Sequence, residues 1–183
     1  MTTALPQAIP QALLIIDVQQ ALFDPPPFEA QAVIQRINAL AERFRAQGRP
    51  VFLVQHQSAQ GALQAGSPGW AFAAGLQQRP GDTVIAKTTP DAYLRTPLEQ
   101  ALREQGVRHV AVCGYASEFC VDTTVRRSAA LGFEVTLVAD AHTTHDKPHA
   151  DAAQIRAHEN ATLPSISSFG PRIRSVPTAE LLL

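Results

Sequence analysis

A chain of 183 residues, 45% of them hydrophobic, is long enough to bury one sizeable core and short for two, so we expect a single domain. Its 15 lysines and arginines are nearly balanced by 16 aspartates and glutamates, and neither sign collects along one face, which argues against nucleic acid or a membrane as a partner. Only two cysteines occur and no secretory signal opens the chain, so we expect a cytoplasmic setting.

Short apolar runs alternate with amphipathic stretches from residue 12 onward. The run at residues 12–16 suits a strand buried on both faces, and it leads directly into Asp17. Residues 29–47 repeat their apolar side chains at helical spacing, and Gly48 ends that helix. The other expected elements are strands at 50–56, 83–87, 109–114, 133–140 and 172–176, and helices at 97–105, near 119–131 and near 149–161.

Strands alternating with helices predict an α/β fold of three layers, α/β/α, with a six-stranded, mainly parallel, Rossmann-like sheet. Residues 1–11 are expected to be a flexible leader, because they show no apolar period, and residues 12–183 to form one domain. The apolar runs are far shorter than the roughly 20 residues that a membrane-spanning helix needs. The connection at residues 59–80 is long and aperiodic, and such loops are often functional.

Polar side chains stand at or just after the ends of five expected strands. Ligands of open parallel sheets bind beyond the carboxyl ends of the strands, where loops and helix N-termini converge. The residues that this rule selects are Asp17, His56, Lys87, Cys120 and Asp140.

Three of these residues form a chemically sensible set. Cys120 falls in the expected first turn of a helix, where backbone amides and a neighbouring Lys87 would lower the thiol pKa. Asp17, if within reach, would take the thiol proton and later deliver it to a leaving amine. The trio therefore suits acyl transfer.

Simpler interpretations stand beside this one. A cysteine near a strand end is often only a small buried apolar group, and Cys113, inside an apolar strand, fits that description. An aspartate such as Asp17 often serves as a turn residue or helix cap, and a lysine such as Lys87 is usually solvated. Spacing alone does not decide between these interpretations.

Four blocks of sequence add a family resemblance. They read LIIDVQ at residues 14–19, VIAK at 84–87, GYASEFCVDTT at 114–124 and GFEVTLVADA at 132–141. In this order and spacing the chain resembles the isochorismatase-like cysteine hydrolases, which include nicotinamidases, N-carbamoylsarcosine amidases and ureidoacrylate amidohydrolases. The resemblance covers nearly all of the chain after residue 11.

The resemblance implies a catalytic triad on Asp17, Lys87 and Cys120. It also implies a cis peptide between Tyr115 and Ala116, which would turn the amides of Ala116 and Cys120 toward one oxyanion. Family members are commonly dimers or higher oligomers, so a homo-oligomer is expected.

No metal and no cofactor are expected. Nicotinamidases carry an aspartate and several histidines after the second strand, whereas this chain keeps only His56 there. Zinc usually takes at least three protein ligands, so we also disfavour nicotinamide as the substrate. A second group of histidines is His142, His145 and His149. The segment that carries them includes a proline and has no helical spacing that would bring the three rings together, so we expect it to shape a loop near the mouth of the site.

A small substrate pocket is expected around the triad. Each of its aromatic members has ordinary core packing as an alternative, and Trp70 could instead reach a neighbouring subunit. The expected lining residues are Gln19, Phe23, His56, Trp70, Tyr93, Tyr115 and Phe119.

The expected function is hydrolysis of an amide, carbamoyl or ureido C–N bond of a small molecule through a thioester on Cys120. Relatives that hydrolyse the vinyl ether of isochorismate tend to lack the cysteine, which favours C–N cleavage. The alternatives are a non-catalytic binding or scaffold protein of the same fold, an isochorismatase-type hydrolase of another substrate, and a redox sensor, which the spacing of Cys113 and Cys120 disfavours.

Overall fold

A computed structural model of the protein describes residues 11–183, and within them every expected helix and strand is present. The strands are β1 (Gln11–Ile16), β2 (Val51–His56), β3 (Thr83–Lys87), β4 (His109–Tyr115), β5 (Glu134–Thr143) and β6 (Ile173–Val176). The α-helices are α1 (Ala30–Ala46), α2 (Leu98–Glu104), α3 (Asp122–Ala130) and α4 (Ala152–Thr162). A π-helical turn, Ser117–Val121, takes the place of the expected start of the helix near 119.

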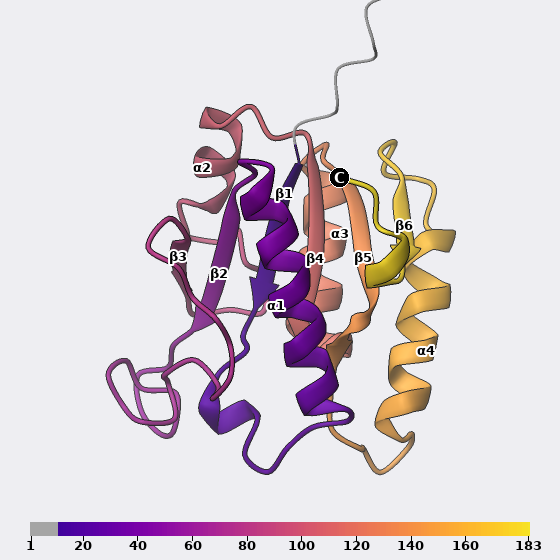
Figure 1. Ribbon diagram of the computed structural model, residues 1–183. Coiled ribbons are helices and arrows are strands. Elements are labelled where there is room, and N and C mark those ends of the chain that lie inside the picture. The colour runs from indigo at the N-terminus through magenta and orange to yellow at the C-terminus, as the bar shows by residue number, and fades with distance from the viewer. Residues whose placement is uncertain (1–10) are drawn as a thin grey trace, which may run out of the picture.

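The six strands form one parallel sheet in the order β3-β2-β1-β4-β5-β6 (Figure 1). The chain winds outward from β1 through β2 to β3, then crosses back to β4 and winds the other way. The direction therefore changes between β1 and β4, and the carboxyl ends of these two neighbours form the switch point at which such sheets bind ligands.

Helices cover both faces of the sheet, as the three-layer prediction requires (Figure 1). On one face α1 packs against alternate residues of β1 and β2, and on the other α2 and α3 do so. Burying a large apolar side chain stabilises a fold by about 1.5–3 kcal/mol, so these two layers hold the strand ends in place. The α1 side chains that enter the core are those at the predicted helical spacing: Val33, Ile34, Ile37, Leu40, Ala41 and Phe44.

Strand β5 runs three residues beyond its expected end at Asp140. Val112 pairs with Leu137, but Gly114 pairs with His142, so β5 bulges by three residues between these two pairs. The bulge turns Asp140 toward the C-terminal segment, where its carboxylate accepts hydrogen bonds from the backbone and hydroxyl of Thr178. Asp140 therefore anchors the chain end and takes no part in the strand-end site.

The flexible leader expected at residues 1–11 lies outside the described residues, except for Gln11. Gln11 opens β1, is buried and accepts a 2.9 Å hydrogen bond from Arg49, so the first strand begins one residue earlier than expected. None of the helices within residues 11–183 combines the length and the apolar character needed to span a bilayer.

At Gly114 the backbone of β4 lies close against the backbone of β1. The glycine φ of +115° is rarely adopted by other residues, and a Cβ there would lie 2.1 Å from the carbonyl oxygen of Ile16 and 2.7 Å from its nitrogen. Both contacts are backbone, so neither can move without displacing the end of β1, from which Asp17 follows.

We predict that Gly114→Ala lowers the free energy of unfolding by about 3 kcal/mol or more, because strain in φ adds to a backbone clash. Gly132→Ala is the matched control, since Gly132 also has a positive φ of +91° but open space around its missing Cβ. Gly132→Ala should lower the free energy of unfolding by only about 1 kcal/mol. Urea unfolding of the two variants measures the difference, and equal losses would contradict the assignment of the clash.

Candidate functional site

Lys87 is the centre of a cluster at the carboxyl edge of the sheet. Its Nζ lies 2.6 Å from Oδ2 of Asp17 and 3.3 Å from Sγ of Cys120. The same ammonium donates to the carbonyl of Thr89 at 3.0 Å and faces Nδ1 of His56 at 3.3 Å. The side chains of Lys87 and Asp17 are 0% and 2% exposed, so this is a buried ion pair. The structure thus brings together the three side chains that the strand-end rule combined.

Asp17 reaches the cluster because the chain turns sharply as β1 ends. Its φ of +49° places it in the left-handed region, which Asp and Asn tolerate better than most residues. Its amide still bonds to the carbonyl of Val54 at 2.9 Å, so the turn stays attached to β2. Lys87 occupies only Oδ2, and among the described residues the buried Oδ1 has no hydrogen-bond partner. One acceptor of the carboxylate is therefore free.

Cys120 is held by the π-helical turn that follows β4. The peptide between Tyr115 and Ala116 is cis, at the junction expected from the family resemblance. The carbonyl of Ala116 then accepts bonds from the amides of Phe119 and Val121, both at 3.1 Å. This turn leaves Ala116 and Cys120 side by side in the wall of one cavity.

The electrostatics of the thiol differ from the sequence-based expectation. Burial, and after it the neighbouring carboxylate of Asp17, raises the pKa of Cys120 to about 12, although Lys87 opposes the shift. Burial also raises the pKa of Asp17, again against the effect of Lys87. The expected low thiol pKa is therefore wrong for the resting protein. Cys120 rests as a thiol, and its ionisation requires a proton acceptor.

A cavity of about 220 Å³ opens onto this cluster. Its walls are mostly apolar, and the polar groups that enter it belong to the cluster or to its immediate neighbours. Three of the expected pocket residues line it, namely His56, Tyr115 and Phe119. The full set of lining residues is Asp17, Leu22, His56, Leu63, Pro90, Tyr115, Ala116, Phe119 and Cys120.

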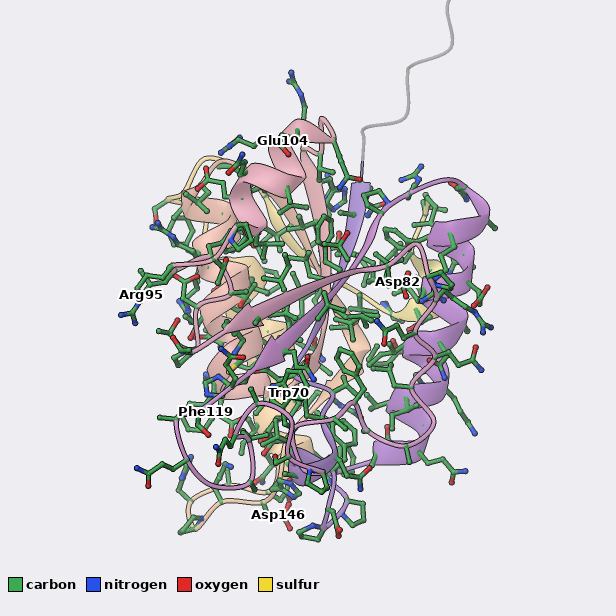
Figure 2. The ribbon with its side chains drawn as sticks, turned by 90° about the vertical axis from the view of Figure 1, so that its left-hand side faces the viewer. Trp70, Asp82, Arg95, Glu104, Phe119 and Asp146 are labelled. Carbon is green, nitrogen blue, oxygen red and sulfur yellow. The ribbon has the colours of Figure 1, made fainter. Side chains whose placement is uncertain are left out.

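Gln19 and Trp70 do not line the cavity. The buried Gln19 amide donates to the carbonyl of His56 and to that of Trp70, both at 2.9 Å, and accepts from the His56 amide at 2.8 Å. It thereby ties the end of β2 to the long loop at residues 57–82. Figure 2 shows Trp70 on that loop, at the same end of the molecule as Phe119. The amide of Gln19 is therefore used by backbone groups.

Phe23 and Tyr93 also lie outside the lining. Phe23 packs against the ring of Tyr115, with centroids 6.0 Å apart, so it supports a lining residue from outside. Tyr93 points into the core between β4 and α3, where its hydroxyl bonds to Ser128 at 2.8 Å and its ring stacks on Phe133. The ordinary core interpretation therefore holds for Tyr93.

Sequence reasoning missed three apolar lining residues: Leu22, Leu63 and Pro90. Leu22 and Pro90 lie only five and three residues beyond Asp17 and Lys87, a proximity that could have pointed to them. Leu63 lies in the long loop, whose path to the cavity depends on its conformation and left no sequence signal.

His142, near the end of β5, and His145 and His149, which follow that strand, are separated from one another by their partners. His142 is buried, with Nδ1 2.8 Å from the Ser117 hydroxyl, and His145 packs edge-on against Tyr115. His149 lines a different cavity. Within residues 11–183, no three His, Cys, Asp or Glu side chains are placed to hold a metal ion. His145 thus stands behind the wall of the site, while the absence of a metal stays a prediction.

Cys113 lies inside β4, fully buried, with Sγ 3.5 Å from the carbonyl of Leu14. Burial raises the pKa of its thiol. Both cysteines are free thiols, and only Cys120 has access to the cavity.

Comparison with known proteins extends these observations. Residues 11–168 match the protein-family model of the isochorismatase domain. The chain is 32% identical to a solved isochorismatase structure from Pseudomonas putida KT2440, with a TM-score of 0.85 over 98% of this chain and 94% of that one.

Two streptothricin hydrolases from Streptomyces noursei are 38% and 39% identical over 94% of this chain, which spans 65% and 59% of their length. A ureidoacrylate amidohydrolase, RutB from Variovorax paradoxus, is 32% identical over 80 residues, covering 43% of this chain and 31% of its own.

The raised thiol pKa predicts an unusual response to mutation. Asp17→Asn should shift the alkylation of Cys120 by iodoacetamide to lower pH, because it removes the negative charge that opposes the thiolate. Lys87→Met should shift it to higher pH, because it removes the stabilising cation. The rate is followed by mass spectrometry in a Cys113→Ala background. If the pH at the midpoint of alkylation were the same or higher in Asp17→Asn than in the parent protein, this electrostatic account would be refuted.

Proposed function

Because the chain belongs to the isochorismatase family of hydrolases, we propose that it is a cysteine hydrolase that cleaves a C–N bond of a small molecule. The observation that carries the proposal is the buried contact of one ammonium, Lys87 Nζ, with both the Asp17 carboxylate and the Cys120 sulfur. The substrate class comprises amides, carbamoyl compounds and ureido compounds. The name of the similar RutB, an amidohydrolase, supports this class.

The first step is proton transfer from Cys120 to Asp17. The free Oδ1 of Asp17 is the acceptor, and Lys87 stabilises the sulfur as it becomes negative. Because the resting thiol has a pKa of about 12, the thiolate forms only as it attacks the substrate carbonyl. The unpartnered Oδ1 beside the cluster supports Asp17 as the acid and base of this proposal.

Attack forms a C–S bond and places a negative charge on the carbonyl oxygen. The backbone amides of Ala116 and Cys120, both residues of the cavity wall, are the proposed donors to that oxygen. Removing one donor from such an arrangement typically costs about 3 kcal/mol in the barrier.

Collapse of the intermediate breaks the C–N bond, and the protonated Asp17 gives its proton to the leaving nitrogen. A thioester on Cys120 remains. Asp17, again a carboxylate, then takes a proton from water as the water attacks the thioester, and the proton returns to the sulfur as the C–S bond breaks. Lys87 keeps its charge throughout, and the net reaction consumes one water.

The cavity limits the acyl group of the substrate. Its volume of about 220 Å³ is below the usual range of about 300–1,000 Å³ for ligand pockets, and Leu22, Leu63 and Pro90 contribute apolar walls. We propose a small acyl group with little charge beside the reacting carbonyl, while the leaving nitrogen carries any larger substituent toward the open side.

The proposal predicts that a panel of small amides, carbamoyl and ureido compounds contains substrates, detected by release of ammonia or amine. Cys120→Ala should abolish this release, and Asp17→Asn or Lys87→Ala should lower kcat by about 10⁴-fold or more, because such groups act as a unit. Circular dichroism should show Cys120→Ala to be folded.

Cys113→Ala is the matched control, since it removes the other thiol from the core and should leave turnover intact. A thioester of Cys120 trapped by acid quench should appear as a mass increase equal to the acyl group. Turnover that survives Cys120→Ala would exclude the nucleophile. A panel without any turnover or Cys120 adduct would favour the non-catalytic binding protein.

A further inference from the structure

His142 lies at the bulged end of β5, where its backbone pairs with Gly114 of β4. It is fully buried, and both of its ring nitrogens have partners. Nδ1 lies 2.8 Å from the hydroxyl of Ser117, and Nε2 lies 3.1 Å from Oδ1 of Asn160 on α4. Ser117 is the first residue of the π-helical turn that carries Cys120. A buried imidazole thus connects β5 and α4 to the turn of the catalytic site.

The direction of each hydrogen bond in this chain of side chains follows from Asn160. Its Nδ2 donates to the carbonyl of Ala139 at 2.9 Å, and a carbonyl only accepts, so Oδ1 of Asn160 is free to act as an acceptor. The ring Nε2 of His142 must therefore carry a proton and donate it to Oδ1. Burial lowers the pKa of His142 to about 4, so the ring is neutral and has only this one donor. Nδ1 is left as the acceptor of the Ser117 hydroxyl proton.

The residues that follow along the same segment hold the next residue of the turn. The Thr144 hydroxyl donates to Oε1 of Glu118 at 2.9 Å, and Nζ of Lys147 lies 3.2 Å from the same oxygen. The backbone hydrogen bonds inside the turn join it only to itself. Within residues 11–183, the polar side-chain contacts of Ser117 and Glu118 therefore all lead to the end of β5 and the loop that follows it.

We propose that His142 is a positioning residue for the proposed hydrolysis, on which this inference rests. By accepting the Ser117 proton, it fixes the turn that carries the Cys120 sulfur and the amides of Ala116 and Cys120. A displacement of about 1 Å in a reacting group can cost about 100-fold in rate, so a bond that sets the position of the turn controls turnover without touching the substrate. A β-bulge is suited to this task, because it re-aims one side chain of a strand.

A purely structural role of His142 is the alternative, and two substitutions separate the roles. His142→Asn places an amide oxygen near the position of Nδ1, where it can accept from Ser117, but it does not reach Asn160. His142→Gln reaches Asn160 in place of Nε2 but has no acceptor at the position of Nδ1. Both side chains are neutral, like the ring that they replace, so neither changes the charge around the thiol.

Steady-state kinetics on the best substrate of the amide, carbamoyl and ureido panel is the first test. His142→Asn should keep kcat within about threefold of the parent value, because the turn stays tied. His142→Gln and Ser117→Ala should each lower kcat by about tenfold or more with little change in KM, because a displaced turn weakens the transition state more than substrate binding.

Ser175→Ala is the matched control. The Ser175 hydroxyl donates to the same Oδ1 of Asn160 at 2.7 Å, so its loss removes one bond from the chain of side chains and leaves the bond between His142 and Ser117 in place. We expect parent values of kcat and KM for this variant. Urea unfolding should show comparable losses of stability for His142→Asn and His142→Gln, since each keeps one of the two hydrogen bonds of the ring.

The rate of Cys120 alkylation by iodoacetamide at one fixed pH is a readout that needs no substrate. A displaced turn changes the distances of the sulfur from the buried ion pair that faces it, and with them the fraction of thiolate. In a Cys113→Ala background the rate should change by about threefold or more in His142→Gln and Ser117→Ala, which corresponds to a pKa change of about half a unit. It should stay at the parent value in His142→Asn.

Equal losses of kcat in His142→Asn and His142→Gln, or parent values of both kcat and alkylation rate in His142→Gln, would overturn the positioning role. If neither His142 variant folds, Ser117→Ala decides, and parent values of kcat and alkylation rate in that variant would overturn the inference. A panel without turnover or Cys120 adduct in the parent protein would instead refute the proposed hydrolysis. The alkylation rates would then still show whether His142 fixes the turn.

Discussion

The buried ion pair between Lys87 and Asp17 is the constraint on which the site depends. The two residues stand at the ends of β3 and β1, which are separated in the sheet by β2, and their 2.6 Å contact bridges that gap. Burying either charge alone would be costly, so each holds the other in place. Cys120, held by the turn after β4, completes the group, since the same ammonium also faces its sulfur at 3.3 Å.

This arrangement gives the carboxylate and the thiol opposite tasks. Lys87 occupies one oxygen of Asp17 and leaves the other free, while burial, and after it the charge of Asp17, raises the pKa of Cys120. Gly114 contributes by letting β4 approach β1, which brings the turn that carries the sulfur next to Asp17.

The sequence predicted the elements from short-range patterns, and the strand-end rule predicted which three side chains meet. Alternating runs identify strands and helices, and the parallel sheet brings the strand ends of Asp17, Lys87 and Cys120 to one edge. Side-chain direction is not contained in such patterns. Tyr93 follows Lys87 closely yet enters the core, and Leu63 reaches the cavity through a long loop. The direction of the thiol pKa shift was predicted wrongly because the burial of the sulfur, which is its main cause, is a tertiary feature.

A double-mutant cycle on the ion pair tests the central claim most directly. Urea unfolding would be measured for Asp17→Asn, Lys87→Met and the variant carrying both changes. Each single change should lower the free energy of unfolding by about 3–5 kcal/mol, because it leaves one buried charge unpaired. The combined change should then cost clearly less than the sum of the two, since no lone charge remains. Strictly additive losses would show that the two charges do not depend on each other, and would contradict this account of the site.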